Sequence, residues 1–167
     1  MTDFSITTLP TLTALVHRTP LNTDPTTNRP DFRTAHHVGT AALKQFVAEK
    51  GLKDALDRKY TSISIIPTDP TPVFEPGHLL QAGGIATVRS LLPSTAPVTG
   101  LMLRTIEAGE WARQVHRGPL EGLAASWEKG CGTVKEEGWV VDAGRVKWEG
   151  YVEGGQVVEI FLPVRRG

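Results

Sequence analysis

Apolar residues at helical spacing mark two segments of the chain. Within residues 32–47 they recur at intervals of three and four, which predicts an amphipathic helix with one buried face. Pro30 suits the start of this helix, and Gly51 suits its end, where a left-handed residue is favoured. A second apolar stripe over residues 120–134 predicts another helix, which ends at Gly138.

Shorter segments rich in alternating or β-branched apolar residues predict strands. Clusters of Pro, Gly and Asp separate them and predict loops at residues 19–30, 67–77 and 94–97. The Glu153-Gly154-Gly155 sequence predicts a tight turn between the last two strands. The predicted strands are residues 5–17, 60–66, 84–91, 98–106, 111–116, 146–152 and 157–164.

A repeated hexapeptide organises these elements. Val-His-Arg-Thr-Pro-Leu at residues 16–21 recurs as Val-His-Arg-Gly-Pro-Leu at residues 115–120, and each copy is followed by a helix and two strands. This order predicts an α+β fold of two tandem strand-helix-strand-strand repeats, with the helices packed on one face of an antiparallel sheet. We expect a single domain over residues 1–167, with repeat one at about 5–91 and repeat two at about 98–164.

Length and charge narrow the classes of function. The 167 residues suffice for one well-buried core, and 18 basic residues balance 18 acidic ones, which disfavours non-specific binding to nucleic acid. The apolar runs are too short to span a membrane, and the first residues lack the features of a signal peptide. The single cysteine, Cys131, permits no internal disulfide, which fits a reducing cytoplasm. We therefore expect a cytoplasmic protein that binds neither nucleic acid nor membrane.

The five histidines do not follow the spacing of metal ligands. His36 and His37 are adjacent on a predicted helix and cannot both face one ion. His17 and His116 lie in the repeated hexapeptide, where we expect a structural role just before each helix. No glycine-rich nucleotide-binding loop or nucleophile motif is present in the sequence. We expect neither a metal nor a cofactor.

The last predicted strand carries one carboxylate among apolar neighbours. Val158, Ile160 and Leu162 form one aliphatic face that should pack on the helices, so Glu159 and Phe161 point the other way. In an open sheet that other face is solvent, and Glu159 is then an ordinary solvated residue. If the two repeats pair side by side, the same face becomes the floor of a groove, where a carboxylate among aromatic rings suits a lipophilic cation.

Aromatic side chains supply candidate walls for such a groove. Trp148 and Tyr151 have opposite parity on one predicted strand, so without a bulge at most one of them faces it. Trp127, on the second helix, could reach the edge of the groove, whereas Phe46 has the spacing of a core residue. The candidate ligand-binding residues are Tyr60, Trp111, Trp127, Trp148, Tyr151, Glu159 and Phe161.

Four segments resemble the gyrase-inhibitor-like (GyrI-like) family of small-molecule-binding domains: residues 109–112, residues 116–123 with Trp127, residues 148–151 and residues 159–164. The resemblance implies two repeats related by a pseudo-twofold axis, with a ligand cleft between them and a cleft glutamate that matches Glu159. We expect a stand-alone member, because the chain leaves no room for a helix-turn-helix. Gln114 stands where the family often has an aromatic residue, and Trp148 replaces a common tyrosine. These two departures from the family pattern concern the identity of the ligand more than the fold.

The resemblance supports two functions that the residues alone do not separate. The first is binding or sensing of lipophilic, often cationic aromatic compounds such as drugs or toxins. The alternative is a hydrolase that opens strained cyclopropane rings of DNA-alkylating natural products, with Glu159 as the catalytic carboxylate. A protein inhibitor, of gyrase for example, would need an exposed acidic or apolar patch that the sequence does not show.

Overall fold

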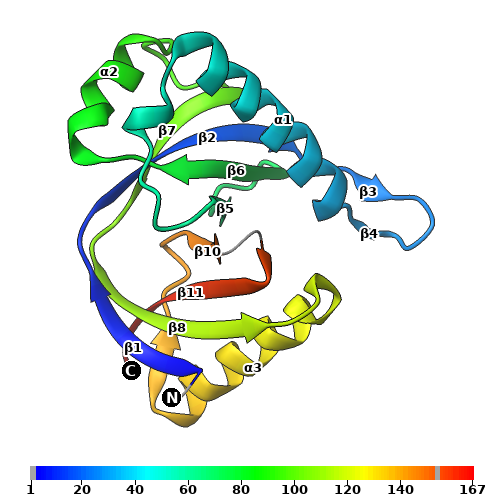
Figure 1. Cartoon of the computed structure of the whole chain (residues 1–167). Helices are drawn as coiled ribbons and strands as arrows, with labels where there is room; N and C mark the ends of the chain where they lie inside the picture. Colours follow the sequence, from blue (N-terminus) through cyan, green and yellow to red (C-terminus); the bar gives the residue numbers. More distant parts are fainter. Residues whose placement is uncertain (1–2, 153–154) are drawn as a thin grey trace.

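The computed structural model describes residues 3–152 and 155–167 and contains a nine-stranded antiparallel sheet with helices on one face (Figure 1). The helices are α1 (Phe32–Lys50), α2 (Ile85–Ser90) and α3 (Leu123–Glu136). The strands of the sheet are β1 (Phe4–Leu9), β2 (Leu12–Pro20), β5 (Ser62–Ile66), β6 (Val73–Leu79), β7 (Gly100–Ile106), β8 (Gly109–Arg117), β9 (Trp139–Val141), β10 (Lys147–Val152) and β11 (Val157–Arg166). A separate short ribbon pairs β3 (Thr23–Asp24) with β4 (Arg29–Pro30).

The strand order shows the predicted duplication. It runs β1-β8-β11-β10-β5-β6-β2-β7, with β9 paired to β11. The unit β2-α1-β5-β6 therefore corresponds to β8-α3-β10-β11, and the two units meet where β10 pairs with β5. The predicted α+β fold of two strand-helix-strand-strand repeats is confirmed.

The edge strands cross between the two units. The predicted strand at residues 5–17 is two strands, because Pro10 interrupts it. The first of them, β1, pairs with β8 of the second unit, whereas β2 stays in the first unit. Similarly, β7 pairs with β2. Figure 1 shows both exchanges as long curved segments that run from one arm of the strongly bent sheet to the other.

The predicted position of the last strand of the first unit is wrong. Residues 84–91, predicted as a strand, form the end of a 3₁₀ turn and then α2. The strand of this unit is instead β6, most of which lies in the predicted loop at residues 67–77. Pro76 pairs with Ser64 of β5 and lies where the pairing between β2 and β6 is interrupted, which suits a residue without an N–H. Gly77 is needed because an added Cβ would lie 2.5 Å from the Leu15 carbonyl oxygen.

Local signals set the helix ends. The N-cap of α1 is Asp31, whose carboxylate accepts a hydrogen bond from the Thr34 N–H at 3.0 Å. Its C-cap is Gly51 with φ 63°, as predicted. The predicted second helix divides into a 3₁₀ turn at Leu120–Gly122 and α3, which continues past Gly130. Of the predicted turn Glu153-Gly154-Gly155, the first two residues lie outside the described part of the chain.

The histidines of the hexapeptide have the structural role that the sequence suggested. His116 donates from Nε2 to the Pro119 carbonyl at 2.9 Å, and its Nδ1 lies 2.8 Å from the Ser126 hydroxyl, which ties the start of α3 to β8. In the other copy, His17 Nδ1 lies 2.7 Å from the Thr19 hydroxyl. The contacts of His116 therefore reach the following helix, whereas the contact of His17 stays within β2.

The two faces of the sheet carry separate apolar clusters. Val158, Ile160 and Leu162 pack with Val134 of α3, which confirms the predicted parity of the last strand. The opposite face holds a second cluster in which Trp148 and Phe161 stack at a centroid distance of 4.1 Å. That face is neither solvent nor an open floor but a closed aromatic core. No helix within the described residues is long and apolar enough to cross a membrane.

Candidate functional site

The structure divides the seven candidate residues between the two faces of the sheet. Trp127 and Tyr151 lie on the face that bears the helices. Trp148 and Tyr151 are on opposite faces, as their parity predicted. The face away from the helices holds the other five residues, Tyr60, Trp111, Trp148, Phe161 and Glu159.

Glu159 is enclosed and its charge is already balanced. The Tyr60 hydroxyl donates to one carboxylate oxygen at 3.0 Å, and Arg113 forms an ion pair with the other. Burial, followed by the charge of Glu159, raises the pKa of Tyr60, so its hydroxyl stays protonated and can donate. Glu159 is 7% exposed, and the neighbouring Trp148 is 1% exposed. The aromatic rings around this carboxylate form core rather than groove wall.

A groove opens on the other face, between α1 and the residues that lead into α3. Its volume is about 580 Å³, within the range of small-molecule sites. An adjoining hollow of about 340 Å³ extends it to Trp127 and Ile66. The groove is lined by Phe32, Arg33, His36 and His37 from α1, Phe74 from β6, Glu149 and Tyr151 from β10, and Leu120, Glu121 and Leu123.

The walls of the groove are largely apolar and aromatic. Phe32 and Phe74 meet edge to face at 5.3 Å, and the rings of His36 and Tyr151 meet in the same way at 5.5 Å. Phe32 is 44% exposed and Leu120 is 52% exposed, which is unusual for side chains of this size. Apolar residues that stay open to solvent around a hollow are typical of a site that a ligand covers.

Glu149 supplies the carboxylate of the groove. Tyr151 donates its hydroxyl proton to one oxygen at 2.5 Å, and Trp127 donates its indole N–H to the other at 2.9 Å. Burial raises the pKa of Glu149, and these two hydrogen bonds oppose that rise. Burial and the adjacent carboxylate also raise the pKa of Tyr151, which keeps the phenol protonated as a donor.

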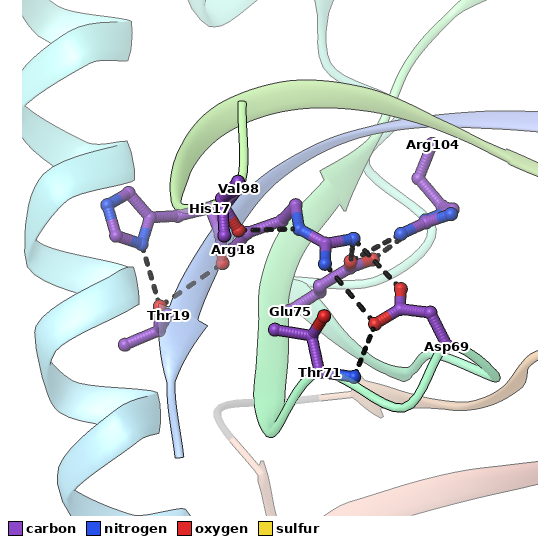
Figure 2. A network of polar contacts seen from close by, with 8 residues as sticks. All are labelled: His17, Arg18, Thr19, Asp69, Thr71, Glu75, Val98 and Arg104. Atoms are coloured by element: carbon purple, nitrogen blue, oxygen red, sulfur yellow. Dashed lines mark hydrogen bonds and ion pairs between the residues drawn. The ribbon is translucent and has the colours of Figure 1, made fainter. Parts of the chain in front are cut away.

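Comparison with the other enclosed glutamates distinguishes Glu149. Glu75 is fully buried, and Figure 2 shows it between the guanidinium groups of Arg18 and Arg104, with Asp69 beside Arg18. Glu159 has Arg113. Within the described residues, no lysine or arginine lies within ion-pair distance of Glu149. Its negative charge therefore has no lysine or arginine counterion, although a positive charge on His116 would lower its pKa.

Sequence reasoning missed Glu149, although a usable signal was present. Glu149 and Tyr151 share parity on one strand, and Tyr151 was already a candidate. The same alternation that was applied to the last strand would have placed both on one face. His36 and Phe74 carried no such signal, because they come from the other repeat and meet Glu149 only in the folded chain.

Comparisons with known proteins give the fold. No family model and no curated protein matches the sequence. The structure is similar to the C-terminal domain of EcmrR, with a TM-score of 0.59, 11% identity and coverage of 98% of each chain. It spans 57% of the EcmrR chain in that protein's DNA complex, with a TM-score of 0.61 and 12% identity.

Two further solved structures share the fold. One is a hydrolase encoded by lin2189 from Listeria innocua, with a TM-score of 0.56, 13% identity, and coverage of 97% of this chain and 91% of that one. The other is SAV2435 bound to tetraphenylphosphonium, with a TM-score of 0.54, 12% identity, and coverage of 97% and 93%. At these identities the likeness establishes architecture and leaves the ligand to be argued from the site.

Proposed function

We propose that this chain, which has the gyrase-inhibitor-like fold, binds lipophilic aromatic cations in the groove between α1 and α3. The observation that carries this proposal is the enclosed carboxylate of Glu149, which has donors from Tyr151 and Trp127 but no lysine or arginine partner among the described residues. Enclosing a charge is costly unless an opposite charge accompanies it. A bound cation would supply that charge.

The size and lining of the groove favour an apolar aromatic ligand. Phe32, Phe74 and Trp127 offer ring surfaces around Glu149, and ring faces attract cations that have lost part of their water. The volume of about 580 Å³ suits a compound of a few fused or linked rings. That SAV2435, a protein with this fold, binds the aromatic cation tetraphenylphosphonium supports the same ligand class here.

This proposal assigns to Glu149 the role that the sequence pattern suggested for Glu159. Both are glutamates on strands of the second unit, but Glu159 is already paired with Arg113. A cation at Glu159 would have to displace that guanidinium and enter a closed aromatic core. A cation at Glu149 needs no such rearrangement.

Replacing Glu149 by Gln is expected to weaken binding of tetraphenylphosphonium about tenfold, because the amide keeps the size of the side chain but loses its charge. Calorimetric titration and quenching of Trp127 fluorescence would both report the change. Glu121→Gln is the matched control, since Glu121 lies on the exposed rim of the groove and should affect binding less than twofold. Equal affinity of wild type and Glu149→Gln would refute the role of Glu149.

Ring-opening hydrolysis is a second candidate function, favoured by the raised pKa of Glu149 and by its position in the wall of the groove beside Tyr151. A carboxyl group whose pKa is closer to neutrality exchanges protons more readily with water or with a leaving group. Incubation with an electrophilic cyclopropane compound separates the two functions. Addition of one water to the compound, seen by mass spectrometry and lost in Glu149→Gln, would identify a hydrolase, and unchanged compound would leave binding alone.

A further inference from the structure

A chain of polar contacts leads from Glu149 across the seam between the two units. Tyr151 lies 2.5 Å from the Glu149 carboxylate and 3.2 Å from the Ser64 hydroxyl on β5. Ser64 in turn lies 3.5 Å from Nδ1 of His36 on α1. The contacts therefore connect a carboxylate of the second repeat with an imidazole of the first.

The direction of each contact follows from counting protons. An ionised carboxylate only accepts, so Tyr151 gives its single proton to Glu149. The Tyr151 oxygen must then accept from Ser64, which leaves the Ser64 oxygen to accept from His36 Nδ1. This order places the imidazole proton on Nδ1. His36 Nε2 is then an acceptor, and it has no hydrogen-bond partner among the described residues.

His36 therefore adds a second acceptor to a groove whose first acceptor is Glu149. Its half-buried side chain lines the groove from α1. The other charged or titratable groups around the groove are Arg33 and His37 from α1, Glu121 before α3, and Tyr151 and Glu149 from β10. Burial, and then the charge of His37, lower the pKa of His36, so the imidazole is neutral at neutral pH.

We propose that His36 is a specificity-determining residue of the groove, whose Nε2 accepts a hydrogen bond from an N–H of the bound cation. This inference rests on the proposed function and narrows its ligand class. Protonated aromatic amines and amidines carry both a positive charge for Glu149 and an N–H for His36. A hydrogen bond from a charged donor is stronger than one between neutral groups. Fully substituted ammonium or phosphonium cations offer the charge alone.

Two planar three-ring cations test this selectivity at pH 7.5. Protonated 9-aminoacridine carries N–H donors, and 10-methylacridinium carries none. We expect wild-type protein to bind 9-aminoacridine about tenfold more tightly in calorimetric titration, the factor typical of one charge-assisted hydrogen bond. His36→Leu should weaken binding of 9-aminoacridine by a larger factor than binding of 10-methylacridinium, so that the preference is lost. His36→Gln, whose amide oxygen can replace Nε2 as acceptor, should restore part of the preference.

The pH dependence of ligand affinity provides an independent test of the role of His36. As the pH falls from 7.5 to below 6.5, towards the lowered pKa of His36, protonation of its imidazole removes the acceptor and adds a repelling charge, so the affinity of wild type for 9-aminoacridine should fall. Protonation of Glu149 also weakens binding but does so in every variant. The additional loss in wild type relative to His36→Leu therefore isolates the contribution of His36. Protons released on binding, measured by calorimetry in buffers of different ionisation enthalpy, should decrease in His36→Leu.

The outcomes separate this inference from the function on which it rests. If both acridines bind equally and Glu149→Gln weakens both, the groove binds cations and the role of His36 is refuted. If His36→Leu weakens both compounds by the same factor, His36 is only part of the wall, and the inference fails again. If neither compound binds to wild-type protein, the proposed function and the inference fall together.

Discussion

Replacing Glu75 by Gln is expected to lower the free energy of unfolding by about 3–5 kcal/mol, the cost typical of breaking a buried ion pair by removing one partner. Glu75 is fully buried and accepts hydrogen bonds from Arg104 at 2.8 Å and 2.5 Å and from Arg18 at 3.0 Å. Glutamine keeps the volume but leaves two largely enclosed guanidinium groups without their shared carboxylate. Urea unfolding followed by tryptophan fluorescence measures the loss.

This network connects three strands of the sheet, β2, β6 and β7. Arg18 lies on β2 and Arg104 on the edge strand β7, and Arg18 also donates to the Val98 carbonyl at 3.0 Å, as Figure 2 shows. Asp69→Asn is the control. The Asp69 side chain is 35% exposed, and exposed ion pairs contribute at most about 1 kcal/mol. Equal losses of unfolding free energy in Glu75→Gln and Asp69→Asn would show that the burial of Glu75 does not cause the destabilisation.

Local signals in the sequence were sufficient for α1 and α3 but not for the short helix α2, which was predicted as a strand. Both α1 and its glycine cap follow from a periodic apolar stripe and from residues next to it in the chain. The strand β6 could not be found in this way, because Pro76 and Gly77 are loop signals in isolation. Their place in a strand depends on a gap in the pairing with β2 and on the nearby Leu15 carbonyl, both set by distant residues.

Prediction of the site from the sequence was limited in a similar way. Alternation correctly put Glu159 on the face away from the helices, but alternation does not tell which face is open. The strong bend of the sheet closes that face over Trp148 and Phe161, whereas the helices leave a groove on the other. Glu149 could have been found from its shared parity with Tyr151. His36 could not, since only tertiary contacts bring α1 to β10.

Replacing Glu159 by Gln is expected to cost about 2 kcal/mol of stability and to change the affinity for tetraphenylphosphonium less than twofold. The amide can still accept from Tyr60, but Arg113 loses its ion-pair partner. Arg113 is one-third exposed and can recover part of its hydration, so the loss should be smaller than for Glu75. Urea unfolding and calorimetric titration of the same protein sample give both quantities.

The informative comparison is with Glu149→Gln, which should show the reverse pattern. Glu149 is enclosed without a lysine or arginine partner, and burial raises its pKa although the hydrogen bonds from Tyr151 and Trp127 lower it. Its charge therefore adds little to stability, and removing it should weaken the ligand rather than the fold. A tenfold loss of affinity in Glu159→Gln with unchanged unfolding would instead place the cation on the opposite face. Arg113 would then have to move aside when the ligand enters, because Arg113 and Tyr60 already occupy the two carboxylate oxygens of Glu159.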